Sequence, residues 1–334
     1  MTAGRRYVEA RAGHLATRSA AGLFDFSFMG HWEVSGRHAR AFLERLQSRD
    51  LAALAPGRIY YTLLLRDDGT VFNDATVWCL DPERYWLFTG RPGDLEWIRE
   101  CPGFGETQVA PLSGRHAILA LQGPRTFEVL RGTLSAPLGY FAFTQAPLAG
   151  VPAWVARLGY SGERGVEILV PAAAGAAVWR ALAQPGVAEC SFETADSLRV
   201  ESGYILFRNE LAHDPDPFEL GLARLVTGRG CIGAAALAPR RRAGPRRKLV
   251  GLVPTGSVRA VGSLPEARLT SEAYSPVFGR ALAMGFAPAD CAAPGTLLRL
   301  ADGRVARSAR LPFYDPCRVI PRGAPPADAV TNRR

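Results

Sequence analysis

The chain has 334 residues and a net charge of +9, with 48% hydrophobic and 21% charged residues. Its length and composition predict a globular protein of two or three domains and exclude an intrinsically disordered chain. No apolar run approaches the roughly 18 residues of a membrane helix, and the two N-terminal arginines precede no apolar secretory segment, so we expect a cytoplasmic protein without a membrane partner.

The first predicted elements are a helix followed by a β-hairpin. Apolar residues at helical spacing predict a helix over residues 37–54, which a Pro-Gly pair ends. Two apolar runs, residues 59–65 and 75–80, flank the turn sequence of residues 66–70. An apolar run, a turn signal and a second apolar run are typical of a hairpin.

Strands and helices then alternate along the chain. Residues 84–90 predict a third strand that leads into a helix over residues 94–99. Residues 117–124 predict a strand that stops at Gly-Pro, before a helix over residues 125–131. After residue 248 the sequence changes to short apolar runs with Gly and Pro, which favours a small all-β unit.

The cysteines and histidines form no metal-binding pattern. The six cysteines are scattered singly, and we interpret them as small buried hydrophobic residues. They are Cys79, Cys101, Cys190, Cys231, Cys291 and Cys317. The five histidines show no zinc-ligand spacing, and we expect no metal site.

Much of the positive charge is local. Residues 239–248 carry six positive side chains in ten positions, and their Pro and Gly predict a loop rather than a helix. We interpret this segment as a solvated linker, and the alternative is a landing surface for a polyanion. No nucleic-acid-binding motif accompanies it, so we expect no nucleic-acid partner.

Five short segments carry a resemblance to a known family. They are residues 120–124 (ALQGP), 159–167 (GYSGERGVE), 214–222 (DPDPFELGL), 275–279 (SPVFG) and 311–314 (LPFY). In this order they resemble the landmarks of the aminomethyltransferases, the T-proteins of glycine cleavage. The resemblance implies tetrahydrofolate as the cofactor.

The resemblance also implies the architecture. It predicts an α+β fold of three domains, arranged as a disc around a central folate channel. Residues 1–245 would form a folate-binding region of two intertwined α+β subdomains, and residues 246–334 a small C-terminal β-barrel domain.

The resemblance assigns five site residues. A fixed carboxylate can accept hydrogen bonds from adjacent N–H donors of a pterin ring, and Glu167 matches the family's pterin-binding glutamate. Tyr160 and Glu201 are implied as further cofactor-binding residues. Asp74 matches the catalytic aspartate, whose carboxylate would stabilise positive charge at the folate nitrogens or relay a proton. Tyr61 matches a tyrosine across the hairpin from Asp74.

Asn73 stands where the family has the first of two aspartates. Because an amide carries no charge that repels Asp74, we expect Asp74 to ionise more easily than it would beside a second aspartate. A structural interpretation remains open for both motifs. Asn73 and Asp74 would then serve a turn or a strand edge, and residues 159–167 would be a plain hairpin turn.

Three departures from the family pattern surround the expected entry of the one-carbon donor. Ala195 replaces an arginine, residues 25–29 read DFSFM in place of DVSHM, and Thr89 and Gly90 replace Asn-Ala. We therefore expect a conventional folate half and an altered donor half. The predicted function is that of a tetrahydrofolate-dependent transferase that moves an aminomethyl or methyl unit to or from a specialised small molecule, with a carrier protein as a further possible partner.

Three alternatives stay open. One is a folate-dependent demethylase of O-, N- or S-methyl compounds. Another is the glycine-cleavage aminomethyltransferase itself, which needs the lipoyl arm of a carrier protein. The third is a noncatalytic folate-binding accessory protein, whose family motif contains a cysteine that residues 202–210 lack.

Overall fold

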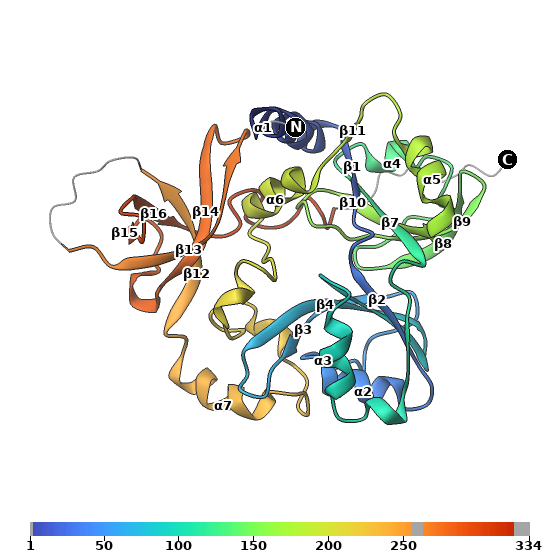
Figure 1. The fold of residues 1–334 in the computed structure, drawn as a ribbon, viewed down its shortest axis with the longest axis horizontal. Coiled ribbons are helices and arrows are strands. Elements are labelled where there is room, and N and C mark those ends of the chain that lie inside the picture. Colours follow the sequence, from blue (N-terminus) through green and yellow to red (C-terminus); the bar gives the residue numbers. More distant parts are fainter. Residues whose placement is uncertain (1–2, 256–262, 324–334) are drawn as a thin grey trace.

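The computed structural model describes residues 3–255 and 263–323 (Figure 1). In these residues the chain forms a six-stranded sheet, a five-stranded sheet and a third, C-terminal group of five strands, with helices packed around them. The predicted mixed α+β class is confirmed. No helix in the described part of the chain is long and apolar enough to cross a membrane.

The six-stranded sheet contains strands from distant parts of the sequence. Its order is β11-β1-β7-β10-β9-β8. The strands are β1 (Ala21–Asp25), β7 (His116–Gln122), β8 (Phe143–Leu148), β9 (Val151–Ala156), β10 (Gly165–Pro171) and β11 (Val187–Glu189). The short helices α4 (Thr126–Val129) and α5 (Gly175–Leu182) pack against this sheet and close its hydrophobic core.

The five-stranded sheet lies in sequence between β1 and β7. Its order is β3-β4-β5-β2-β6. The strands are β2 (Gly30–Ser35), β3 (Ile59–Leu65), β4 (Val71–Asp81), β5 (Arg84–Thr89) and β6 (Gln108–Pro111). Helices α2 (Ala39–Leu46) and α3 (Asp94–Glu100) supply the apolar side chains that cover one of its faces. The chain thus leaves the first sheet, builds the second and returns to the first.

The C-terminal strands pair in a closed order. They are β12 (Arg247–Pro254), β13 (Glu266–Ser275), β14 (Arg280–Pro288), β15 (Leu297–Leu300) and β16 (Val305–Ala309). The order is β12-β14-β13-β15-β16, and β16 pairs again with β12. This group of strands lies on the left in Figure 1, beside α6 (Phe192–Glu201).

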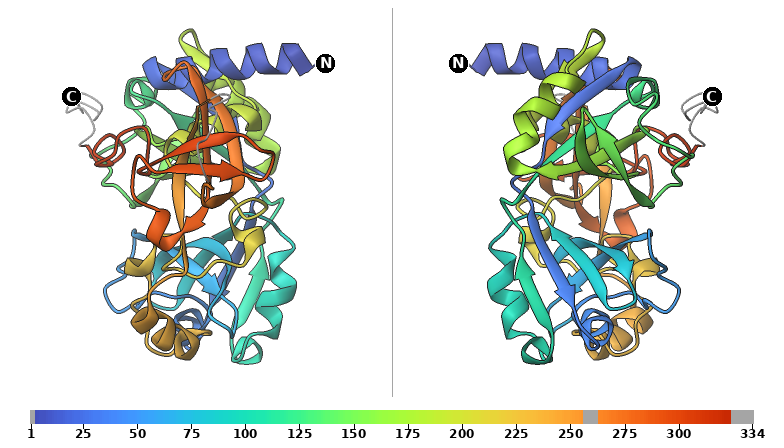
Figure 2. Two further views of the ribbon diagram at one scale, coloured as in Figure 1. Left: turned by 90° about the vertical axis from the view of Figure 1, so that its left-hand side faces the viewer. Right: turned by 90° about the vertical axis from the view of Figure 1, so that its right-hand side faces the viewer.

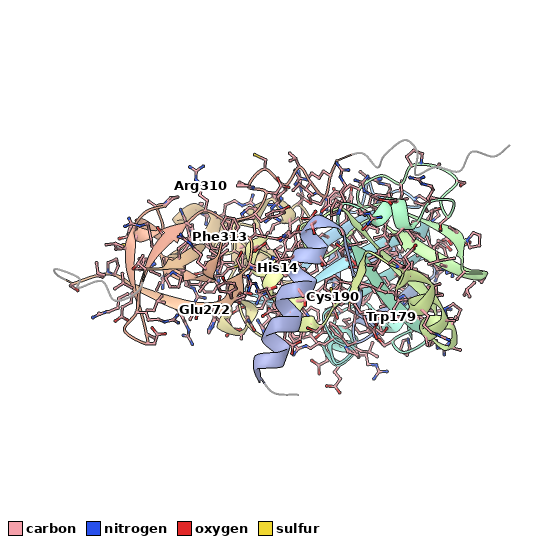
Figure 3. The ribbon with its side chains drawn as sticks, turned by 90° about the horizontal axis from the view of Figure 1, so that it is seen from above. His14, Trp179, Cys190, Glu272, Arg310 and Phe313 are labelled. Carbon is pink, nitrogen blue, oxygen red and sulfur yellow. The ribbon has the colours of Figure 1, made fainter. Side chains whose placement is uncertain are left out.

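Helix α1 (Ala3–Ser19) packs against α6 and the six-stranded sheet at one end of the molecule. It lies across the top in Figure 1 and crosses over the centre of the molecule when seen from above (Figure 3). In both side views it runs at the end opposite α2 and α3 (Figure 2). Its main contacts are with α6, so α1 and α6 together form the helical layer between the C-terminal strands and the six-stranded sheet.

The predicted strands agree with the structure better than the predicted helices. The hairpin of β3 and β4 forms around the predicted turn, and β5, α3 and β7 lie where the sequence predicts them. The helix predicted over residues 37–54 ends at Leu46, however. The Gln47 side chain bonds to the backbone N–H and C=O of Arg49 and accepts from Thr62, which draws the chain into an extended bridge with Leu64. The helix predicted over residues 125–131 likewise shortens to α4.

The prediction of a loop in the arginine-rich segment is wrong for its first half. Residues 239–243, predicted as part of a loop, form the last turns of α7 (Ala234–Ala243). Four alanines and a leucine precede Pro239, and these strong helix formers carry the helix through the missing N–H of the proline. Gly244, with a φ of 75°, then ends the helix, since an L side chain rarely adopts that conformation.

The cysteine prediction holds for half of the residues. Cys79, Cys101 and Cys231 are buried, whereas Cys317 is exposed. All six thiols are free, and the described residues hold no group of three or more potential ligands arranged to bind a metal.

An aromatic core between the two sheets contains a buried histidine. His31 on β2 is 1% exposed, stacks on Phe88 with ring centroids 4.1 Å apart and meets the edge of Trp86. Neither ring nitrogen has a hydrogen-bond partner in the described part of the chain. Burial, and then the charge of His116, lowers the pKa of His31 to about 3.

We expect His31 to make the fold sensitive to acid. The unfolded chain takes up a proton on His31 below its ordinary pKa of about 6.5, whereas the folded chain stays neutral down to about pH 3, so stability falls as the pH drops through this window. The loss at pH 5 is about 2 kcal/mol. Urea unfolding of wild type and His31→Leu at pH 8 and pH 5 measures it. An equal pH-dependent loss in both proteins contradicts this role for His31.

Candidate active site

The three groups of strands meet at one cavity of about 810 Å³. Strands β3, β4 and β5 line one side, and β10 contributes a single carboxylate. The remaining walls come from residues 158–160, 203–207 and 220–225 and from the C-terminal segment at residues 311–322. No single part of the fold forms this cavity alone.

Asp74 and Tyr61 lie next to each other on the β3–β4 hairpin. Asp74 is directly opposite Leu63, and Tyr61 is opposite Thr76, so Asp74 and Tyr61 are diagonal neighbours on one face of the hairpin. The Tyr61 hydroxyl donates a hydrogen bond of 3.0 Å to Asp74 Oδ2, and both side chains line the cavity.

Burial dominates the ionisation of this pair. It raises the pKa of Asp74 to about 6, although the hydrogen bond from Tyr61 acts in the opposite direction. Burial together with the Asp74 charge raises the pKa of Tyr61 well above its ordinary value, so Tyr61 stays a donor. A carboxyl group with a pKa near neutrality suits general acid–base chemistry.

The amide of Asn73 has a structural role, because it donates to a buried aspartate. It is fully buried, and its amide donates a hydrogen bond of 2.6 Å to Asp94 Oδ2 at the start of α3. Arg91 pairs with the other oxygen of Asp94 at 2.7 Å. A carboxylate at position 73 would face Asp94 instead of donating to it, so the amide avoids adding a further negative charge to that of Asp94 near Asp74.

Glu167 is a buried acid without a protein partner. It lies on β10 at 6% exposure and lines the cavity. Its carboxylate forms no hydrogen bond or ion pair with the residues that the structure describes, and burial alone raises its pKa to about 7. An unsatisfied buried carboxylate costs free energy unless a ligand supplies donors. Adjacent N–H groups of a pterin edge would supply them, so this position fits the implied cofactor.

Tyr160 lines the cavity and also supports a neighbouring part of its wall. Its hydroxyl donates a hydrogen bond of 2.6 Å to the carbonyl of Ile205, and its ring stacks on Tyr204 with centroids 5.8 Å apart. The loop with the sequence GYSGE thus connects β9 to β10 and also forms part of the cavity wall.

The structure does not bring Glu201 to the cavity. One of its oxygens accepts from Ser275 and lies 2.9 Å from His14 Nε2, and the other bonds to Arg18 at 2.8 Å. These partners, with charge stabilisation from Arg18, lower the pKa of Glu201 despite its burial. Glu201 therefore joins α1 to α6, and the cofactor-binding role implied by the resemblance stays a prediction without support from this geometry.

The departures from the family pattern bring apolar side chains to the cavity. Phe26 and Phe28, which stand in place of a valine and a histidine, line it beside the unchanged Met29, and Phe28 is 47% exposed. Gly90 matters because a Cβ atom there would meet the Phe207 ring at 2.7 Å. The missing side chain at Gly90 therefore lets Phe207 approach and form part of the wall. Ala195, the third departure, is buried in the aromatic core.

Sequence reasoning missed the positive residues of the cavity. They are Arg49, Arg58, Arg224, Arg318 and Arg322, and none of them forms an ion pair within residues 3–255 and 263–323. They come from separate loops without a shared motif, so no pattern in the sequence links them. Their charge would favour an anionic group on a bound ligand.

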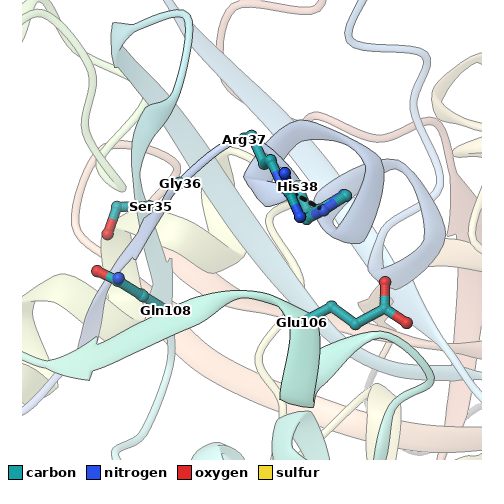
Figure 4. Close-up of a pocket in the computed structure, with 6 residues that line it drawn as sticks. All are labelled: Ser35, Gly36, Arg37, His38, Glu106 and Gln108. Carbon is teal, nitrogen blue, oxygen red and sulfur yellow. Dashed lines mark hydrogen bonds between the residues drawn. The ribbon is translucent and has the colours of Figure 1, made fainter.

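A second hollow lies on the surface. It has a volume of about 500 Å³ and lies near the start of α2, between the end of β2 and the start of β6 (Figure 4). Arg37 donates there to the neighbouring His38 ring at 2.8 Å. None of the predicted site residues lines this hollow, whereas Asp74 and Glu167 both line the larger cavity.

Comparisons with known proteins agree with the predicted family. Residues 5–229 match the family model "GCVT N-terminal domain". The chain is 36% identical to an aminomethyltransferase of Symbiobacterium thermophilum, over 90% of this chain and 88% of that protein. It is also 36% identical to an aminomethyltransferase of Streptomyces avermitilis, over 92% of this chain and 90% of that protein.

A solved structure is similar over the same length. The crystal structure of the glycine cleavage system aminomethyltransferase T from Bartonella henselae has a TM-score of 0.79 and 29% identity, covering 91% of this chain and 89% of that one. The fold and the family match are those of a tetrahydrofolate-dependent transferase. The chain belongs to the GCVT aminomethyltransferase family.

Proposed function

We propose that this protein transfers an aminomethyl or methyl unit between tetrahydrofolate and a small, specialised substrate. The observation that carries the proposal is that two acids in different surroundings line one cavity, Glu167 buried and Asp74 half-buried. Glu167 lacks any partner and suits binding, whereas Asp74 is held by Tyr61 and suits catalysis. The division into residues 1–245 and 246–334, and the disc around a folate channel, belong to the same proposal.

The residues of the chain have separate tasks. Glu167 would accept hydrogen bonds from the pterin edge, with Tyr160 holding the adjacent wall. Bound tetrahydrofolate would supply the nucleophilic nitrogen that takes up or releases the carbon. Asp74 would stabilise positive charge at this position and hold a proton on its carboxylate, while Tyr61 fixes the orientation of that carboxylate.

The apolar donor end supports a specialised substrate. Phe26 and Phe28 depart from the family pattern, and Phe207 packs at Gly90, which also departs from it. These three rings form apolar walls, so an apolar body on the substrate would be favoured there. The named relatives are aminomethyltransferases, and the Bartonella protein is one of a glycine cleavage system. A carrier-borne aminomethyl group is therefore the second candidate substrate.

Product analysis tests the proposal. Tetrahydrofolate is incubated with the protein and with pools of aminomethylated and O-, N- or S-methylated compounds, and the folate product is identified by mass spectrometry. A 5,10-methylene product indicates aminomethyl transfer, and a 5-methyl product indicates demethylation. Activity restricted to a lipoyl carrier protein would replace the specialised substrate by the glycine-cleavage role. Tight folate binding without any turnover would leave the accessory-protein alternative.

The arginines of α7 are expected to be unnecessary for turnover. Arg240 pairs with Asp216 at 3.3 Å, and Arg241 lies over the Phe218 ring at 5.6 Å, so both serve local packing. We expect replacement of Arg240, Arg241 and Arg242 by Ser to retain turnover with monoglutamyl folate, since surface pairs contribute only about 0–1 kcal/mol. A large loss of turnover at low salt would place this surface in substrate binding.

A further inference from the structure

A buried glutamate joins the C-terminal strands to the cavity wall. Glu210 is fully buried, and its carboxylate receives hydrogen bonds from four donors. Arg199 donates at 2.9 Å from α6, and the backbone N–H of Leu206 donates at 2.8 Å. The hydroxyls of Thr270 and Ser271 on β13 supply the other two, the first at 2.7 Å. Glu210 does not itself line the cavity.

An irregularity in β13 explains how two neighbouring hydroxyls reach one carboxylate. Successive side chains of a regular strand point to opposite faces, so Thr270 and Ser271 would normally point apart. The register between β13 and β14 shifts between Leu269 and Ser271, which marks a β-bulge. A bulge inserts an extra residue and changes the direction of a side chain. Here it directs both hydroxyls towards Glu210.

The segment on the other side of Glu210 is a wall of the cavity. Residues 203–207 line the cavity, and three consecutive backbone groups of this wall are fixed by side chains. Arg199 donates to the carbonyl of Tyr204 at 3.2 Å, and the Tyr160 hydroxyl donates to the carbonyl of Ile205. Glu210 accepts from the N–H of Leu206.

We propose that Glu210 is a positioning residue for the transfer reaction, through which Thr270 and Ser271 of the C-terminal strands set the place of the cavity wall at residues 203–207. The inference rests on the proposed function. The buried Arg199–Glu210 pair alone would be weak evidence of a stabilising role, because desolvation offsets much of its attraction. The link of one carboxylate to the wall, to α6 and to the bulged strand points to positioning instead.

The electrostatics of the site agree with this role. The charge of Glu210 is among the influences that raise the pKa of Asp74, after burial and the charge of Asp94. It also acts on Tyr160, whose hydroxyl holds the same wall. A change at Glu210 therefore acts on the wall and on the protonation of Asp74 together.

The double variant Thr270→Val/Ser271→Ala tests the proposal without leaving Arg199 unpaired. Ser308→Ala is its matched control, because Ser308 is also buried on the same strand group and bonds to the N–H of Thr296, far in sequence from the wall. We expect the double variant to lose about 10–100-fold in kcat, since a small displacement of a positioned group costs about this much. The control should keep the kcat of the wild type.

Glu210→Gln adds a readout that a purely structural role would not move. Loss of its negative charge should shift the acid limb of the kcat profile to lower pH, because that charge raises the pKa of Asp74. If the double variant and Ser308→Ala have the same kcat and pH profile, the proposal is overturned.

A measurement of folate affinity distinguishes failure of this inference from failure of the proposed function. If the wild type turns over none of the donors tested, the dissociation constant for tetrahydrofolate becomes the readout. An increase of about fivefold or more in the double variant, with no change in Ser308→Ala, supports positioning of the wall. Equal affinities in both variants overturn it, whatever the substrate of the enzyme.

Discussion

Replacement of Asp74 by asparagine is expected to lower turnover by about 10²–10⁴-fold. Asparagine keeps the shape of the side chain and can still accept a hydrogen bond from Tyr61, but it carries no negative charge. If the carboxylate stabilises charge that develops mainly in the transition state, the loss falls on kcat, and folate affinity changes by less than about tenfold. Single-turnover kinetics and calorimetry measure the two quantities.

Asp81→Asn is the matched control for this variant. Asp81 ends the same strand, β4, and its carboxylate accepts only a local hydrogen bond from the N–H of Glu83. We expect Asp81→Asn to keep full turnover. Full turnover in Asp74→Asn itself, on an identified substrate, would remove Asp74 from the catalytic role.

The pH profile should report the same carboxyl group. With a pKa of about 6, Asp74 loses its charge as the pH falls below 6, and the rate should fall with it. The hydrogen bond from Tyr61 lowers this pKa, so Tyr61→Phe should move the acid limb of the profile to higher pH.

Replacement of Glu167 by glutamine is expected to weaken tetrahydrofolate binding by about 1.5–3 kcal/mol, or roughly 10–150-fold. The amide would turn a donor towards the N–H donors of the pterin edge. The wild-type affinity should also depend on pH. Because burial raises the pKa of Glu167 to about 7, the free protein is increasingly protonated below pH 7, and the affinity should fall about tenfold between pH 8 and pH 6.

Calorimetry at pH 6, 7 and 8 checks both parts of this expectation. Glu167→Gln should bind weakly with little pH dependence. Glu163→Gln is a suitable control, since Glu163 is buried nearby but pairs with Arg18 outside the cavity lining. Unchanged affinity in a folded Glu167→Gln protein would exclude this residue from the pterin site.

Local sequence patterns predicted the parts of the site that depend on one hairpin. The two apolar runs that flank the turn at residues 66–70 predict the pairing of β3 with β4, and this pairing places Tyr61 and Asp74 on one face. The resemblance added Glu167, which the structure finds on the same cavity as Asp74. Their roles in binding and catalysis stay predictions.

Features that depend on distant contacts could not be read from the sequence. Glu201 looks like any other acid at the end of a helix, and its partners His14, Arg18 and Ser275 come from opposite ends of the chain. The end of α2 at Leu46 depends on the Gln47 side chain, because helical spacing continues beyond it. The helix at residues 239–243 depends on the alanine-rich residues 234–238 that precede it.

The placement of the five-stranded sheet between β1 and β7 has a consequence for synthesis of the chain. Ala21 on β1 pairs with Val187 on β11, so the first strand must wait for about 166 further residues before its sheet can be completed. Residues 30–111 contain every strand of the second sheet and can assemble meanwhile. One edge of β1 can pair with β7 once residue 122 is made, but the edge that pairs with β11 stays free during the whole interval. The cavity takes shape only after Glu167 and the C-terminal segment have been made.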